Sequence, residues 1–231
     1  MAVRLIALGH PVHVAHLDLN PFGEPAELID ITRDSVWLHR YKAANDEAFG
    51  AGPLALPGWV LVDLYVMPTI VGMLVDGDTI LAAYVAVPTL ETGTYFGCSL
   101  LSRAPGSGLA TKIKTLTLKM LRARKQRGLT QITSRSIGVH TRVGPMLLEG
   151  MAPSLHEQAR ESFVYSIDLL SESAWEIAYR GEKIASTHDE ELHDRTSSSL
   201  SALLKRVSHG ERIYIVGLSD DYSHLRVRVT A

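Results

Sequence analysis

The sequence predicts an α+β fold in which helices flank a mixed, mostly antiparallel central sheet, with a helix and a hairpin added at the C-terminal end. Three observations support this prediction. Three β-rich runs follow one another between residues 70 and 101, separated by turn compositions, which is typical of an antiparallel meander. A glycine-rich loop then opens a segment with a 3.6-residue apolar period, which indicates an amphipathic helix. Strand-like and helix-like segments alternate after it.

The first half of the chain supplies a helix and the meander. Residues 34 to 49 begin with Asp and Ser, which can cap free amides, and end at a glycine, so they predict a helix. Strands are expected at residues 70 to 75, 79 to 87 and 94 to 101. The turn between the first two strands, Asp76-Gly77-Asp78, tolerates a positive φ and joins antiparallel strands. Residues 1 to 20 suggest a further strand or small hairpin.

The second half is expected to add four elements and an extension. The apolar face of Leu109, Ile113, Leu116 and Met120 predicts a helix that stops at Gly128. Beyond it the sequence predicts a strand at residues 130 to 137, a short helix at 143 to 149 and a strand at 161 to 169. Residues 1 to 170 are interpreted as the main domain, and residues 171 to 231 as an extension that packs on it.

Composition limits the classes of function. The 231 residues carry a net charge of -2, which supplies no overall field to hold nucleic acid or an anionic membrane, so any polyanion site must be local. A single cysteine, Cys98, excludes an internal disulfide and favours the cytoplasm. The apolar stretch at residues 54 to 75 is interrupted by prolines and glycines, so we interpret it as buried core and not as a membrane span. His10, His13 and His16 point to opposite faces of a strand, and no metal site is expected from them.

The sharpest motif is the loop Arg103-Ala104-Pro105-Gly106-Ser107-Gly108-Leu109-Ala110, directly before the amphipathic helix. Glycines let the backbone turn with its amides pointing inward, and the helix N-terminus adds free N–H donors and a partial positive charge. These are the features that a pyrophosphate needs. Arg103 and Lys112 can add charged contacts, whereas the other basic residues of the helix, Lys114 among them, are interpreted as a solvated face.

The pattern R-x-x-G-x-G, after an antiparallel meander and at the start of a helix, resembles motif A of the GNAT acyltransferases, where it holds the CoA pyrophosphate. The resemblance extends over residues 34 to 169 and implies a GNAT-like domain with acetyl-CoA or another acyl-CoA as donor substrate. It places the pantetheine arm against the main chain of Ser99, Leu100 and Leu101. The loop residues that it assigns to the cofactor are Arg103, Gly106, Ser107, Gly108, Leu109 and Ala110. The alternative is a structural glycine-rich turn.

A second family region follows, usually an Asn, then a helix with a Tyr, then Gly-Phe. Here Gly150-Met151 stands at the Gly-Phe position, Met146 falls where the Tyr is expected, and His140 falls near the Asn. The family's Tyr commonly protonates the departing CoA thiolate, and methionine cannot donate a proton. His140 is therefore the candidate catalytic residue, because imidazole exchanges protons near neutral pH; the alternative is a loop histidine that hydrogen-bonds to backbone.

The expected function is direct acyl transfer from acyl-CoA to an amine, either of a small molecule or of a protein, with no clear nucleic-acid surface. Two alternatives stay open. An acyl carrier protein could supply the acyl group, since apolar residues 54 to 75 could line a long-chain pocket; or the chain is a module that binds acyl-CoA without reacting, as Met146 suggests. A homodimer also stays open, because a terminal hairpin leaves a sheet edge that needs cover.

Overall fold

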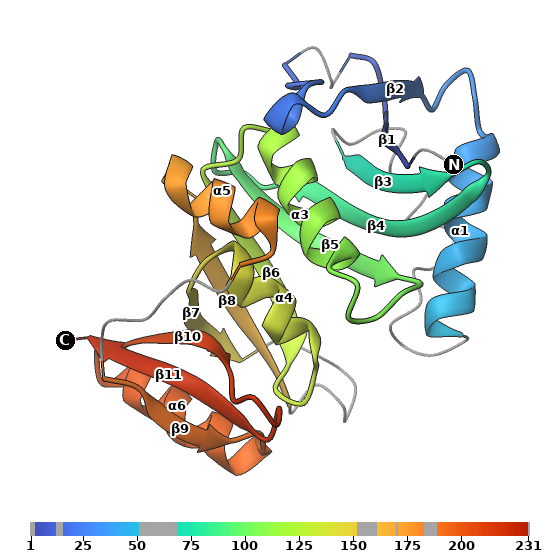
Figure 1. Ribbon diagram of the computed structural model, residues 1–231. Helices are drawn as coiled ribbons and strands as arrows, with labels where there is room; N and C mark the ends of the chain where they lie inside the picture. Colours follow the sequence, from blue (N-terminus) through green and yellow to red (C-terminus); the bar gives the residue numbers. More distant parts are fainter. Residues whose placement is uncertain are drawn as a thin grey trace. The chain divides into compact units, whose positions relative to one another are not determined.

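The computed structural model describes most of the chain, as residues 3–12, 16–50, 69–151, 161–169, 171–182 and 189–230. These residues form two compact units, Met1–Arg124 and Lys125–Ala231 (Figure 1). Helices accompany a sheet in both units, and most of the recorded strand pairs are antiparallel. The predicted α+β class is therefore confirmed. The sequence analysis placed a domain boundary at residue 170, between the main domain and the C-terminal extension. That boundary differs from the division between the two compact units at residue 124, and it stays a prediction.

The described residues of the first unit form five strands that pair in the order β2-β1-β3-β4-β5. Its elements are β1 (Arg4–Gly9), the 3-10 helix η1 (Pro21–Gly23), β2 (Ala26–Asp30), α1 (Val36–Phe49), β3 (Ile70–Asp76), β4 (Thr79–Pro88), β5 (Thr94–Ser102) and α3 (Leu109–Met120). β1 and β2 are parallel, whereas β1 with β3, β3 with β4, and β4 with β5 are antiparallel. The predicted meander and the helix at residues 34 to 49 are confirmed.

Helices α1 and α3 cover opposite faces of these strands. Tyr41 and Ala44 of α1 belong to a buried cluster that includes Val85 of β4. The ammonium group of Lys114 in α3 lies 5.9 Å from the ring centroid of Tyr84, the neighbour of Val85 along β4. Because successive strand residues point to opposite faces, the two helices lie on opposite sides of β4.

The second unit has, among its described residues, six strands in the order β6-β8-β7-β10-β11-β9. Its elements are β6 (Lys125–Gln131), α4 (Ser136–Val143), β7 (Met146–Met151), β8 (Ser162–Asp168), α5 (Glu172–Arg180), β9 (Glu191–Asp194), α6 (Ser197–Ser208), β10 (Arg212–Leu218) and β11 (His224–Thr230). The predicted C-terminal helix and hairpin are confirmed as α6 and β10–β11. Strand β10 pairs with β7, so the extension adds strands to the sheet of this unit.

Three predictions for this stretch are wrong. The strand expected at residues 130 to 137 lies earlier, as β6 (Lys125–Gln131), because the chain turns after Gln131 and helix α4 begins at Ser136. The helix expected at residues 143 to 149 is a strand, β7, in which Met146 and Leu148 are buried while Leu147 and Glu149 are only partly buried, the alternation of a half-buried strand. The helix before it, α4, ends ahead of Pro145, which disfavours helical backbone in the residue that precedes it. Helix α3 ends at Met120 and not at Gly128, because Arg122 adopts a left-handed φ of 50° and the chain then enters β6.

Candidate functional site

The glycine-rich loop between β5 and α3 depends on a backbone conformation that favours glycine. Gly106 has a φ of 84° and Gly108 a φ of 82°, in the left-handed region. A Cβ atom built on either residue would meet no atom within 4 Å. The space around both glycines is therefore open, and the requirement for glycine comes from the backbone angle, as the sequence predicted.

The loop presents free amides at the start of α3. Gly108 is the N-cap residue and supplies no side-chain hydrogen bond. The Ser107 hydroxyl donates to the Ala104 carbonyl at 2.6 Å and accepts a long contact of 3.4 Å from the Leu109 amide. In the part of the chain that the structure describes, the amides of Ala110 and Thr111 donate no hydrogen bond. Two N–H groups and the partial positive charge of the helix end are thus available to an anion.

The two cations assigned to phosphate both have carboxylate partners. The Arg103 guanidinium pairs with Glu47 of α1. The Lys112 ammonium lies 2.6 Å from the Glu24 carboxylate, just after η1. All four side chains are partly exposed, so each pair contributes little to stability, on the order of 0.2–1 kcal/mol. A bound phosphate would compete with these carboxylates for the same cations.

Glu47→Gln is therefore expected to raise the affinity for CoA about two- to five-fold, because it removes the competing carboxylate while Arg103 remains. Calorimetric titration with CoA measures this change, which should shrink at high salt as exposed charges are screened. Asp46→Asn is the matched control, since Asp46 is the neighbouring residue and pairs with Lys42 instead. Equal effects of the two substitutions would mean that overall charge, and not the freed Arg103, sets the affinity.

Strand β5 carries an irregularity next to the predicted cofactor residues. Ser99 is paired with Val85 and Gly97 with Ala86, so Cys98 is an extra residue that forms a β-bulge. The Cys98 residue is exposed, but desolvation of its sulfur raises the pKa of the thiol to about 11, so the thiol stays protonated at neutral pH. A protonated thiol is a poor nucleophile.

Side chains from helix α1 and from strand β4 approach this bulge from opposite faces of β5. On one face, Asn45 of α1 donates from Nδ2 to the Ser99 hydroxyl at 3.3 Å. On the other face, the Tyr84 hydroxyl would lie 2.3 Å from a Cβ on Gly97, so only glycine fits there. Leu101 packs into the α1 cluster and is 3% exposed, which leaves only its main chain for a ligand.

The interpretation of Lys114 as part of a solvated face is wrong. The side chain is 0% exposed, and desolvation lowers the pKa of its ammonium group well below the ordinary 10.5. The residue lies beside Ile113 and one turn before Leu118, both also fully buried. The helix thus buries a wider arc than the stripe of apolar residues indicates, and the arc includes one lysine.

His140 lies in helix α4 of the second unit and not in a loop. It is 6% exposed, and its ring centroid is 5.2 Å from that of Tyr165. The carbonyl of His140 accepts a hydrogen bond from the Gly144 amide where the helix ends. Met146, at the expected tyrosine position, is fully buried in β7. The buried ring contact supports a packing role for His140, and its catalytic role stays a proposal.

Solved structures of known proteins are similar to this chain, whereas the comparisons of its sequence found no match. No protein-family model and no curated protein matches the sequence. The CoA-dependent acyl-homoserine lactone synthase BjaI, solved with SAM and isopentyl-CoA, matches with a TM-score of 0.53 and 11% identity, over 88% of this chain and 100% of the synthase. The same synthase solved with MTA gives the same values. This chain has the GNAT fold.

An acyl-CoA N-acyltransferase from Pseudomonas aeruginosa is also similar, with a TM-score of 0.48, 13% identity, and coverage of 72% of this chain and 99% of that one. Within the GNAT fold of this chain, sequence reasoning placed the loop and β5 but missed Tyr41 and Asn45. Their spacing of four residues put both on one face of the predicted helix. Nothing in the sequence indicated that this face meets Ser99.

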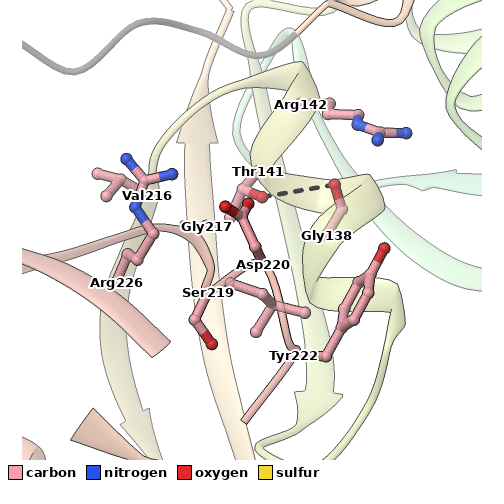
Figure 2. Close-up of a pocket in the computed structure, with 10 residues that line it drawn as sticks. Gly138, Thr141, Arg142, Val216, Gly217, Ser219, Asp220, Tyr222 and Arg226 are labelled. Carbon is pink, nitrogen blue, oxygen red and sulfur yellow. Dashed lines mark hydrogen bonds between the residues drawn. The ribbon is translucent and has the colours of Figure 1, made fainter. Parts of the chain in front are cut away.

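The second unit of this GNAT fold contains a small cavity between α4 and the β10–β11 hairpin. Figure 2 shows Asp220, Thr141 and Ser219 among its lining residues, with Arg142 pointing away from them. The guanidinium of Arg226 is held by two contacts of 2.5 and 2.9 Å to Glu190. The cavity of about 90 Å³ is well below the roughly 300 Å³ at which ligand pockets begin. It does not fit a ligand of the size of CoA.

The described residues contain no cluster of three or more His, Cys, Asp or Glu side chains arranged to hold a metal ion. His13, one of the three spaced histidines, lies outside them, as does most of the apolar stretch at residues 54 to 75. Of the described helices, none has the length and apolar character needed to cross a membrane.

Proposed function

We propose that the protein transfers an acyl group from acyl-CoA to an amine by direct attack of the amine on the thioester. The observation that carries the proposal is the loop before α3, with two left-handed glycines, open space around them and free amides at a helix N-terminus. The GNAT fold, which this chain shares with a CoA-dependent synthase, supports acyl-CoA as the donor.

The loop and the strand before it would bind different parts of the donor. The pyrophosphate would lie against the amides at Gly106 to Ala110, with Arg103 released from Glu47. The pantetheine arm would follow the main chain of Ser99, Leu100 and Leu101. Ser102 ends β5 and Arg103 opens the loop, so an extended arm runs from the loop towards the bulge at Cys98. The thioester would then lie near the bulge.

The reaction needs orientation and stabilisation of charge. The amine nitrogen attacks the thioester carbonyl carbon, and the carbonyl electrons move to oxygen to form a tetrahedral oxyanion. The C–O double bond then reforms, the C–S bond breaks, and the sulfur leaves as a thiolate that takes up a proton, while the nitrogen loses one. Holding donor and acceptor together supplies much of the acceleration, and main-chain amides of β5 would stabilise the oxyanion.

Acyl-CoA is expected to protect the protein against heat. A ligand that binds only the folded state adds about 2.7 kcal/mol at 100 times its dissociation constant, which corresponds to a rise in Tm of roughly 5–10 °C for a chain of this size. Thermal melts with acetyl-, propionyl- and long-chain acyl-CoA measure it. If none of them shifts the Tm, the proposal fails. Binding without turnover over a panel of amines would instead identify the non-reacting module that Met146 favours.

The proposed role of His140 has its own test. His140→Ala should lower turnover by roughly 10²-fold with little change in CoA affinity, the range typical of losing a general acid or base. The pH–rate profile of the variant should also lose the limb that a titrating imidazole contributes to it. A folded variant with reduced Tm but an unchanged profile shape would leave His140 only the packing role that its contact with Tyr165 supports.

A further inference from the structure

Helix α1 buries a phenol hydroxyl for which the described residues supply no hydrogen-bond partner of normal geometry. Tyr41 of α1 is 0% exposed, and within the described residues its hydroxyl oxygen makes no hydrogen bond of normal geometry. Leaving a buried hydroxyl without a partner costs about 1–3 kcal/mol, and such groups are rare in native structures. A phenylalanine would fill the same volume without this cost, so the hydroxyl calls for an explanation.

The Tyr41 hydroxyl faces the bulge of β5. Ser99 and Asn45 are close enough to affect it, although neither contact reaches hydrogen-bond geometry, and Asn45 instead donates to the Ser99 hydroxyl at 3.3 Å. Cys98, the exposed bulge residue, is also close enough to interact with it electrostatically. The hydroxyl therefore lies beneath the point where β5 departs from regular pairing with β4.

The position along β5 matches the reactive end of an acyl-CoA. Cys98 precedes Ser102, the last residue of the strand, by four residues, or about 13 Å of extended chain. The pyrophosphate loop begins directly after Ser102. An arm that follows the strand away from the loop brings its thioester, and not its phosphates, to the bulge.

The protonation state suits a hydrogen-bond donor. Desolvation by burial raises the pKa of Tyr41 well above its ordinary value of 10, and nearby Ser99 and Asn45 offset this only in part. The phenol thus keeps its proton at every pH at which the protein would act. It can donate a hydrogen bond, but it is a poor proton-transfer group.

We propose that the Tyr41 hydroxyl donates a hydrogen bond to the carbonyl oxygen of the bound acyl group, an assignment that rests on the proposed acyl transfer. The bond strengthens as the amine attacks and the carbonyl electrons move onto oxygen; when the C–S bond breaks, the carbonyl reforms and Tyr41 still holds its proton. Tyr41 is then a catalytic residue. Asn45 is a positioning residue that acts through Ser99.

The test uses acetyl-CoA labelled with ¹³C at the carbonyl, so no acceptor is required. Wild-type protein should shift the carbonyl resonance downfield on binding, and Tyr41→Phe should return it towards the value of free acetyl-CoA. The affinity for CoA itself should not change. The Tm of Tyr41→Phe should be equal to or above that of wild type, because the substitution removes only an unsatisfied hydroxyl. With an acceptor in hand, turnover should fall roughly 10²–10³-fold.

Tyr84→Phe is the matched control, because Tyr84 is another buried tyrosine whose hydroxyl lies at the same bulge from the opposite face. It should keep the carbonyl shift. An equal loss in both variants would assign the effect to the geometry of the bulge and overturn the role of the Tyr41 hydroxyl. A reduced Tm in Tyr41→Phe with an unchanged carbonyl shift would show a structural hydroxyl and overturn it too.

The two proposals fail in different ways. If wild-type protein binds acetyl-CoA and Tyr41→Phe keeps the full carbonyl shift, the role of Tyr41 is wrong while acyl transfer stands. If wild-type protein binds neither acetyl-CoA nor a longer acyl-CoA, the proposed function is wrong, and the role of Tyr41 is wrong with it.

Discussion

Gly108→Val is expected to abolish the heat protection by acyl-CoA while the protein still folds. Gly108 has a φ of 82°, where a β-branched residue is strained by on the order of 1–3 kcal/mol. If the loop of the variant changes conformation to relieve this strain, its amides turn away from the phosphates. If the loop keeps its conformation, the valine side chain occupies the open volume in which the phosphates would bind. Losing two charge-assisted hydrogen bonds, at about 1.5–3 kcal/mol each, lowers the affinity roughly 10²-fold or more.

Gly77→Val controls for backbone strain. Gly77 lies in the turn between β3 and β4 with a φ of 56°, and a Cβ there also meets no atom within 4 Å. It should lose a similar amount of stability and keep its affinity for acyl-CoA. Calorimetric titration and thermal melts of both variants separate the two effects. Unchanged affinity in Gly108→Val would place the pyrophosphate elsewhere, and equal losses in both would point to general destabilisation.

The parts of the fold that were predicted correctly are those that local sequence determines. Asp76-Gly77-Asp78 specifies a turn whatever surrounds it, and Gly106 and Gly108 specify a loop that only glycine adopts readily. Strand β7 was missed because six residues with a Met-Leu-Leu run suit a helix or a strand equally well. These residues form a strand because they pair with β8 and β10, which come later in the chain.

The missed parts of the site depend on contacts between distant segments. Asn45 and Ser99 are 54 residues apart, and their hydrogen bond follows from the packing of α1 on β5. Arg103 and Lys112 also have partners far away in the sequence, Glu47 and Glu24, so the sequence indicated free cations where the structure has ion pairs. A periodic pattern of apolar residues shows which face of a helix is buried, but the width of the buried face depends on how the helix packs in the folded unit. Lys114 lies outside the apolar stripe and is nevertheless fully buried.

Lys114→Met is expected to stabilise the protein, on the order of 1–4 kcal/mol, the range found when well-packed hydrophobic side chains of similar volume replace buried ion pairs. The wild-type ammonium is 0% exposed, and its desolvation lowers the pKa of Lys114 well below 10.5. Methionine fills a similar volume without charge. At neutral pH the Tm should rise by about 2–4 °C per kcal/mol for a chain of this length.

The pH dependence of this gain identifies its cause. Between the lowered pKa of the folded state and the ordinary value near 10.5, the unfolded chain binds a proton that folded Lys114 does not, so the wild-type free energy of unfolding rises with pH. Lys114→Met lacks this rise, and the difference in Tm between variant and wild type should therefore narrow from neutral pH towards 10.5. Lys119→Met, on the same helix but partly exposed, should show no such narrowing. A constant difference in Tm across this range, or a variant less stable than wild type at neutral pH, would mean that the buried ammonium costs the folded state nothing.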